Sequence, residues 1–264
     1  MVSVKVAAVA GFAALVTTAA SAADLPEIYA PAMPYETAGG WYLRGDIGMT
    51  NQRVDKLFNV LYDTATSVRT VQKEFDSSPL FGLGVGYQFN RWLRVDVTGE
   101  YRGNANFHGF DIVEAGGTFT DEYRASKSEW LVLANVYADL GTWYSFTPFI
   151  GAGVGGSLNR ISNFLDVCTV CPGGGVAFGE AANTWNFAWA LHAGISYRVT
   201  PNVSLEFAYR FVHLGDAFSG DLQTYLGGNL IDNPMEFRNI TSHDLKFGVR
   251  WMLDAPMPPM MRRG

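Results

Sequence analysis

The strongest constraint on how this chain of 264 residues can fold is an alternation of apolar and polar side chains that recurs in separate segments. Residues 79–90 show it most plainly. There Phe81, Leu83, Val85, Tyr87 and Phe89 alternate with Gly82, Gly84, Gly86 and Gln88. A period of two is that of a β-strand whose two faces meet different surroundings. The sequence therefore predicts a protein built almost entirely of strands.

Eight segments share this alternation, and each is long enough to cross a bilayer as a tilted strand. They cover residues 41–51, 79–90, 93–102, 128–141, 147–159, 185–198, 203–211 and 242–253. Short connections fall near Asn90, at 141–146 and at 200–202, and they alternate with long ones. The long connections cover residues 52–78, 103–127, 160–183 and 214–241. Regular spacing of this kind is typical of a chain that crosses a membrane back and forth.

Strands inside a bilayer must close into a barrel, because lipid offers no partner to the backbone groups of an open edge. We therefore predict an all-β fold over residues 41–253. It is an eight-stranded antiparallel transmembrane β-barrel with four long extracellular loops and short periplasmic turns. A soluble barrel with its apolar face around a ligand would show the same alternation. The aromatic content of one face and the long loops at one end favour lipid outside.

The start of the chain predicts export from the cytoplasm. Lys5 precedes an apolar stretch over residues 6–16, and Ala20-Ser21-Ala22 is a small-x-small cleavage site. Residues 1–22 are therefore expected to be a cleaved signal peptide, since so short an apolar stretch does not span a bilayer. Residues 23–40 are expected to form a periplasmic leader and residues 254–264 a periplasmic tail rich in Pro and Met. The predicted location is the bacterial outer membrane.

The charge of the chain excludes one class of partner and draws attention to the lumen. The formal net charge is −6 and no run of Lys or Arg occurs, so no nucleic-acid partner is expected. The polar face of the strands contains seven cations and seven anions: Arg44, Arg94, Arg102, Arg198, Arg210, Lys246 and Arg250, with Asp46, Asp96, Glu100, Glu129, Asp139, Glu206 and Asp244. Side chains just fill the interior of an eight-stranded barrel, so we expect an interlocked network of ion pairs. The alternative is a narrow ion-conducting lumen, with glycine stripes at 82–86 and 151–155 leaving space.

Two cysteines and two histidines are the other candidate site residues. Cys168 and Cys171 lie in the third long loop, and the oxidising compartment favours a local disulfide between them. His213 closes the seventh strand and His243 opens the eighth, so both are expected at the outer rim on one face. Two imidazoles could bind a metal or haem iron, but they do not make a full ligand set. No cofactor is therefore expected, with haem or metal capture as a weak alternative.

Nucleophilic catalysis needs a base next to its nucleophile, and the sequence offers no such pair. No histidine is followed by serine two positions later, which is the spacing of barrel deacylases. The triglycine at 173–175 lacks the strand–turn–helix context of a phosphate-binding loop. The chain is therefore not expected to be an enzyme.

Short motifs give the chain a family resemblance. Lys246, Gly248, Trp251 and Leu253 fit the polar-x-Gly-x-x-aromatic-x-hydrophobic signal at the end of outer-membrane barrels. With the Ala-Asp-Leu-Pro start and the stretch at 209–216, the chain resembles the small surface barrels of alphaproteobacteria, relatives of opacity-type and OmpA-like eight-stranded barrels. The chain continues past the last aromatic, where such proteins commonly stop.

The resemblance implies a barrel that serves envelope structure and surface interaction through its loops. Implied partners are outer-membrane lipids, lipopolysaccharide, the barrel-assembly machinery and a host or surface ligand. The oligomeric state stays open. Loop aromatics at Tyr62, Phe75, Phe119, Tyr123, Phe178 and Tyr225 are expected either to contact a ligand or to pack the loops together.

Overall fold

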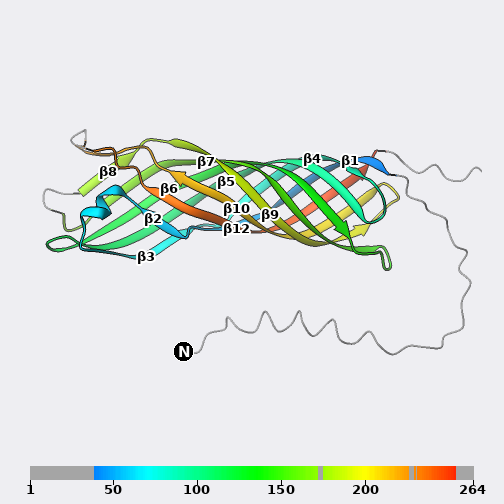
Figure 1. Cartoon of the computed structure of the whole chain (residues 1–264), viewed down its shortest axis with the longest axis horizontal. Helices are drawn as coiled ribbons and strands as arrows, with labels where there is room; N and C mark the ends of the chain where they lie inside the picture. The colour runs from blue at the N-terminus through cyan, green and yellow to red at the C-terminus, as the bar shows by residue number, and fades with distance from the viewer. Residues whose placement is uncertain (1–38, 172–174, 226–228, 230, 254–264) are drawn as a thin grey trace, which may run out of the picture. The chain divides into compact units, whose positions relative to one another are not determined.

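The computed structural model describes residues 39–171, 175–225, 229 and 231–253. The predicted signal peptide, most of the leader and the tail lie outside these residues. Eight long strands dominate (Figure 1): β1 (Gly40–Arg53), β4 (Ser78–Gln88), β5 (Leu93–Glu114), β6 (Thr118–Asp139), β7 (Phe146–Cys168), β9 (Ala182–Arg198), β10 (Val203–Phe218) and β12 (Glu236–Met252). Short elements complete the described part: β2 (Lys56–Phe58), η2 (Val60–Thr64), β3 (Ser67–Phe75), β8 (Gly175–Gly179) and β11 (Leu222–Thr224). None of the helices found there is long and apolar enough to cross a bilayer.

The eight long strands form a closed antiparallel ring. Around the ring the order is β1, β4, β5, β6, β7, β9, β10, β12 and back to β1. The last and first strands pair from Tyr42↔Met252 to Arg53↔Thr241, which removes the free edges. The predicted eight-stranded barrel is confirmed.

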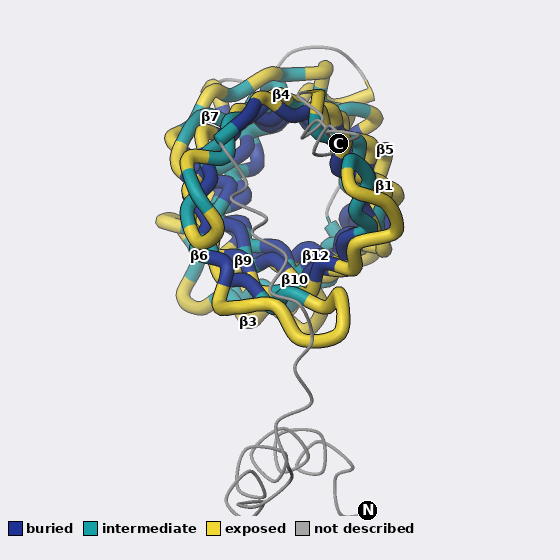
Figure 2. Tube along the Cα trace, turned by 90° about the vertical axis from the view of Figure 1, so that its right-hand side faces the viewer, coloured by how far each residue is buried: buried dark blue, intermediate teal, exposed yellow. Residues whose placement is uncertain are grey.

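Buried and exposed residues alternate along the strands of this wall, as the colours of the tube in Figure 2 and the pattern of β12 show. Along β12, Leu245, Phe247, Val249 and Trp251 are exposed on the outside, while Asp244, Lys246 and Arg250 are buried inside. The apolar set therefore covers the outer wall, which is the arrangement a lipid environment requires. A soluble barrel with a greasy interior does not fit this distribution.

Most of the predicted long loops are strands that continue past the bilayer. β5 and β6 pair as far as Glu114↔Thr118, and β7 pairs with β8 beyond its contact with β9. β2 and β3 pair with β12 and β5. We call the part of residues 52–78, 103–127, 160–183 and 214–241 that the structure describes the cap. It is a folded extension of the barrel on its extracellular end.

The cap has an apolar core of its own, which continues down into the mouth of the barrel. Phe237 lies at its centre, with ring centroids 4.9 Å from Phe107, 6.0 Å from Phe75 and 6.2 Å from Phe164. Leu131 and Leu133 of β6 belong to the same cluster. On β6 these leucines lie between the buried Glu129 and Asn135, so apolar and polar side chains are interleaved at the mouth of the barrel.

Candidate functional site

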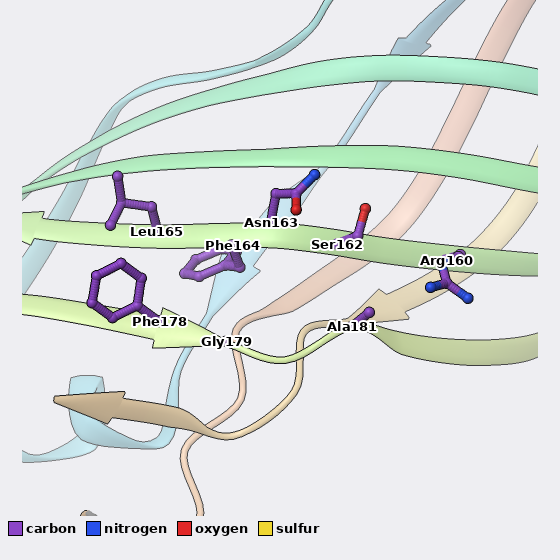
Figure 3. A pocket seen from close by; sticks show the side chains of 8 residues that line it. All are labelled: Arg160, Ser162, Asn163, Phe164, Leu165, Phe178, Gly179 and Ala181. Carbon is purple, nitrogen blue, oxygen red and sulfur yellow. The ribbon is translucent and has the colours of Figure 1, made fainter. Parts of the chain in front are cut away.

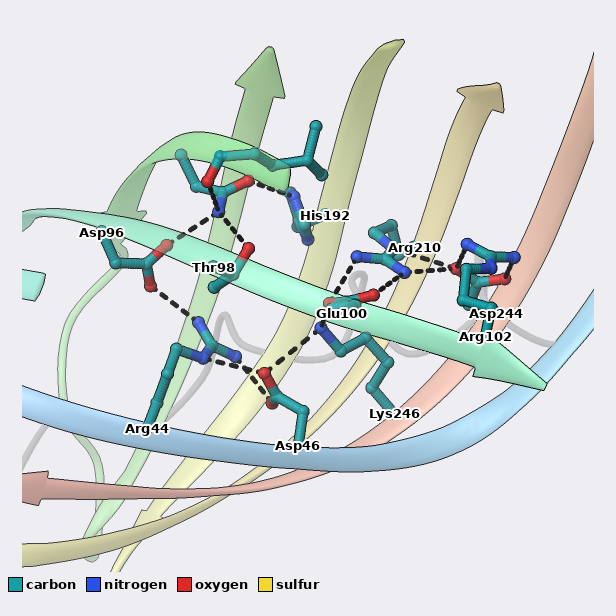
Figure 4. Close-up of polar contacts among 12 residues, drawn as sticks. Arg44, Asp46, Asp96, Thr98, Glu100, Arg102, His192, Arg210, Asp244 and Lys246 are labelled. Carbon is teal, nitrogen blue, oxygen red and sulfur yellow. Dashed lines mark hydrogen bonds and ion pairs between the residues drawn. The ribbon is translucent and has the colours of Figure 1, made fainter. Parts of the chain in front are cut away.

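Two arginines of the lumen, Arg210 and Arg102, reach across the barrel to acids on distant strands (Figure 4). Arg210 of β10 donates from Nη1 and Nη2 to the Glu100 carboxylate on β5 at 2.8 and 2.6 Å, and from Nη2 to Asp244 at 2.7 Å. Lys246 donates to the same Glu100 at 2.5 Å. Arg102 donates to both oxygens of Asp244, at 2.9 and 3.0 Å. Each of these five buried charges therefore has a partner of opposite sign.

A second layer lies toward the periplasmic end. Arg44 donates to both oxygens of Asp46, at 2.9 and 3.1 Å, and to Asp96 at 2.9 Å. The Glu206 carboxylate forms ion pairs with three arginines, with nitrogen–oxygen distances of 3.0–3.4 Å: Arg44, Arg94 and Arg250. Arg94 also pairs with Asp139 at 3.2 Å and stacks over the Tyr137 ring, 4.3 Å from its centroid. These contacts link five strands across the interior.

Side chains of the adjacent strand lie directly over the glycines of the 82–86 stripe. A Cβ on Gly82 would lie 2.8 Å from Cγ of Glu100, and one on Gly84 would lie 2.8 Å from Cγ2 of Thr98. The space that these glycines leave is therefore filled by side chains of the neighbouring strand. This close approach is the reason glycine is needed there.

Arg198 was predicted to face the lumen, and that prediction is wrong. It is the last residue of β9 and its side chain is exposed. Its backbone N–H donates to the Ser145 carbonyl at 2.9 Å, which places it at the rim beside a periplasmic turn. The lumen ends before this position, so the alternation no longer separates inside from outside.

Lys127 is a lumen cation that the sequence did not predict, because residues 103–127 were assigned to a loop. It is fully buried, donates to Gln52 at 2.8 Å and pairs with Glu129. The sequence did hold one signal: Lys127 has the same parity as Glu129, so extending the predicted strand by one residue would have placed Lys127 in the lumen.

Three acidic residues face one another in the cap on adjacent strands. Asp111 pairs in register with Asp121, and Tyr123 with Asp166. Tyr62 donates to Asp111 at 2.6 Å and lies 2.9 Å from the Tyr123 hydroxyl. Burial, followed by the nearby Asp111 charge, raises the pKa of Asp121 to about 6. Burial, followed by the charges of Asp121 and Asp111, raises the pKa of Asp166 to about 7.

The predicted disulfide between Cys168 and Cys171 is present, with the two Cα atoms 5.6 Å apart. It ties the outer end of β7 to the turn before β8. The two sulfur atoms and a carboxylate oxygen of Asp121 lie within 4.8 Å of one another. The sulfurs are bonded to each other, so they are not thiolate ligands in this state.

The structure places the two candidate histidines on the outer face of neighbouring strands, among aromatic rings. His243 Nδ1 lies 2.6 Å from the Tyr209 hydroxyl, and His213 stacks on Trp189 with 6.0 Å between centroids. His243 pairs in register with Phe211, and His213 with Thr241. In the described part of the chain, no third His, Cys, Asp or Glu joins them in a metal-binding group.

The four residues of the assembly motif extend along β12 and just beyond it, from Lys246 in the middle of the lumen to Leu253 at the periplasmic end. Lys246 and Gly248 face the lumen side, whereas Trp251 and Leu253 are exposed on the outer wall. Trp251 pairs with Leu43 of β1 and with Val203 of β10. The motif therefore lies on the strand that closes the ring.

A lipid-facing closed barrel with a charged interior defines an integral outer-membrane protein. The chain matches the outer membrane protein β-barrel domain family over residues 10–252 and belongs to it. An uncharacterised protein of Brucella suis is 31% identical over 268 residues, covering 89% of this chain and 93% of that protein. A Rickettsia prowazekii protein named as a candidate adhesin is 27% identical over 222 residues, covering 80% and 86%. The crystal structure of Neisserial surface protein A is 19% identical, with a TM-score of 0.39, covering 81% of this chain and 98% of that one.

Proposed function

We propose that the barrel is a membrane anchor and that the cap binds a ligand outside the cell. The supporting observation is a set of large apolar side chains exposed on the cap, away from the lipid-facing wall: Leu61, Val71, Val170, Phe178, Tyr225 and Ile231. Tyr225 is 82% exposed and Val170 is 61% exposed. Exposed aromatic and aliphatic residues on a rigid support are typical of recognition surfaces. The likeness to the Rickettsia protein named as a candidate adhesin points in the same direction.

The packing of the other cap aromatics supports this division of roles. Phe75 and Tyr123 are buried in the cap core, and Tyr62 packs against that core. Phe178 and Tyr225 are on its surface. The buried rings hold the cap in one shape, while the exposed rings are available to a partner.

A narrow pore is the second candidate function, and the filled lumen argues against it. Ions would have to pass a layer of paired charges and then the apolar core of the cap. Side chains just fill the interior of a barrel of this size, so we expect both layers to block the passage of ions. Haem capture at His213 and His243 is a weaker candidate, because both rings already contact aromatic neighbours on the outer face.

The test is adherence of a non-adherent Escherichia coli strain that displays the protein. Wild type should bind cultured epithelial cells above the empty-vector level. A triple variant, Val170→Ser with Tyr225→Ser and Ile231→Ser, should lower adherence by about fivefold or more. The matched control is Asp63→Asn with Thr118→Ser, which changes exposed polar cap residues only. Adherence of wild type at the vector level, or equal adherence of the triple variant, would overturn the proposal.

A further inference from the structure

The wall of the cap has a notch between β7, β8 and β9 (Figure 3). β7 pairs with β9 as far as Ile161↔Ala182 and with β8 only from Phe164↔Gly179 onward. Ser162 and Asn163 pair with neither strand on that side, and Asn163 has a φ of 53°. The resulting cavity has a volume of about 500 Å³.

The lining of this notch combines one cation, two neutral polar side chains and an apolar wall. Arg160, Ser162 and Asn163 provide the polar side, and Leu165 and Phe178 provide the apolar side. Arg160 is exposed, and its guanidinium has no ion pair or hydrogen bond to another described residue. Arg124, another exposed arginine of the cap, is neutralised by Glu122 at 2.6 Å, whereas Arg53 and Arg69 are exposed and, like Arg160, form no ion pair with a described residue.

The height of the notch relative to the bilayer follows from the register. Trp130, Leu158 and Trp185 form an outward row across three strands, and Trp185 is 71% exposed. Aromatic rows of this kind lie at the boundary between hydrocarbon and headgroups. The next outward row, one step of about 7 Å further out, contains Ser128, Arg160 and Asn183. Arg160 is therefore at the level of the outer-leaflet headgroups.

We propose that the notch binds the phosphorylated headgroup of an outer-leaflet glycolipid. The Arg160 guanidinium pairs with a phosphate, since its fork of N–H donors matches two phosphate oxygens. Ser162 and Asn163 add neutral hydrogen bonds, and Phe178 and Leu165 cover the apolar side of the headgroup. Glu180 lies on the connection between β8 and β9, but it forms no ion pair with Arg160. The notch therefore keeps the positive charge of Arg160. This lipid contact shares Phe178 with the surface proposed above, but it depends on Arg160, which is not part of that surface.

The test is native mass spectrometry of the folded, detergent-solubilised protein titrated with purified rough lipopolysaccharide. Wild type should retain one lipopolysaccharide molecule, and Arg160→Ala should weaken retention by about tenfold or more, as expected for a lost charged hydrogen bond. Arg160→Lys, which keeps the charge, should fall between the two. The matched control is Arg198→Ala, because Arg198 is also exposed and without an ion pair among the described residues but lies at the periplasmic rim. A heat-dependent shift in gel mobility verifies that each variant is folded.

Two further probes separate the sources of the anion. Dephosphorylated lipopolysaccharide should bind wild type as weakly as intact lipopolysaccharide binds Arg160→Ala. Millimolar inorganic phosphate should fail to displace intact lipopolysaccharide. Equal retention by wild type and Arg160→Ala, or an equal loss in Arg198→Ala, would overturn the proposal. Full displacement by inorganic phosphate or by a soluble sulfated glycan would also overturn it.

Discussion

Arg210 and Glu100 bind each other from opposite sides of the barrel. Their strands, β10 and β5, are four positions apart in the ring of eight and share no backbone hydrogen bond. The guanidinium and the carboxylate nevertheless meet through two contacts of 2.8 and 2.6 Å, and both side chains are buried. Strand pairing holds neighbours together around the wall, whereas this ion pair holds the wall together across its centre.

Removing Arg210 should therefore destabilise the barrel strongly. Arg210→Ala leaves Glu100 and Asp244 buried with one cationic partner fewer, which typically costs about 3–5 kcal/mol. Urea unfolding in lipid vesicles, followed by gel mobility, measures the change in the free energy of unfolding. Arg198→Ala is the control, and it should change that free energy by less than about 0.5 kcal/mol because this side chain is exposed. Equal effects of the two variants would contradict the role given to the network.

The filled lumen leads to a prediction about conductance. The refolded mature protein should give no reproducible single-channel steps in a planar bilayer, because paired charges and the apolar core of the cap close the path. Steps whose size changes in Arg94→Ala or Arg210→Ala would show an open, charge-lined lumen. That result would favour the pore over the anchor.

The cap should become less stable as the pH rises. The folded pKa of Asp166, about 7, lies above its ordinary value of 3.8, so the folded state holds a proton that the unfolded state releases earlier. The unfolding free energy of the cap therefore falls between about pH 4 and pH 7 and stays low above it. Asp121, with a pKa of about 6, acts in the same direction.

Limited proteolysis of the cap measures this effect. The ratio of the wild-type cleavage rate to that of Asp166→Asn should be larger at pH 8.0 than at pH 5.5, because the variant has no carboxylate to ionise. Asp63→Asn is the control, because Asp63 is an exposed acid. The ratio of the wild-type cleavage rate to the rate of Asp63→Asn should be the same at both pH values. A ratio for Asp166→Asn that does not change with pH would contradict the prediction.

The part of the fold inside the bilayer could be predicted because lipid enforces a strict alternation. Each outward position from Leu245 to Trp251 must be apolar, so the sequence shows both the strand and its orientation. The cap lies in water, where the outer face of a strand tolerates polar residues. Register shifts place an extra residue in β5 between Arg102 and Ala105 and in β7 between Ser162 and Leu165. These bulges interrupt the alternation, so the outer parts of both strands resembled loops.

The candidate sites could likewise be predicted only in part. The alternation predicted that Arg44, Glu100 and Arg210 face inward, but it gave no information on which acid pairs with which base. That choice depends on the stagger of strands far apart in the ring. The notch around Arg160 could not be predicted, because it exists only where β7 changes its partner from β9 to β8.

The disulfide should stabilise the cap locally and the barrel hardly at all. Cys168 and Cys171 close a loop of four residues, for which loop closure contributes at most about 2 kcal/mol. Replacing both cysteines with serine should speed proteolysis near Val170 while leaving the heat-dependent gel shift of the barrel unchanged. Loss of that shift would mean that the disulfide is needed for barrel formation itself.

The apolar core of the cap should contribute more to its stability than the disulfide does. Phe237 is fully buried and contacts the rings of Phe75, Phe107 and Phe164, so Phe237→Ala removes the shared centre of the cluster. Substitutions of this kind typically cost about 3–5 kcal/mol. Phe237→Leu fills most of the same space, so it should lower the free energy of unfolding distinctly less than Phe237→Ala does. The difference between the two variants measures the contribution of packing at this position. The rate of hydrogen exchange at the cap amides, measured in lipid vesicles, should rise strongly in Phe237→Ala. The amides of the membrane-spanning strands should stay protected from exchange. Uniform loss of protection over the whole barrel would show instead that cap and barrel unfold as one unit.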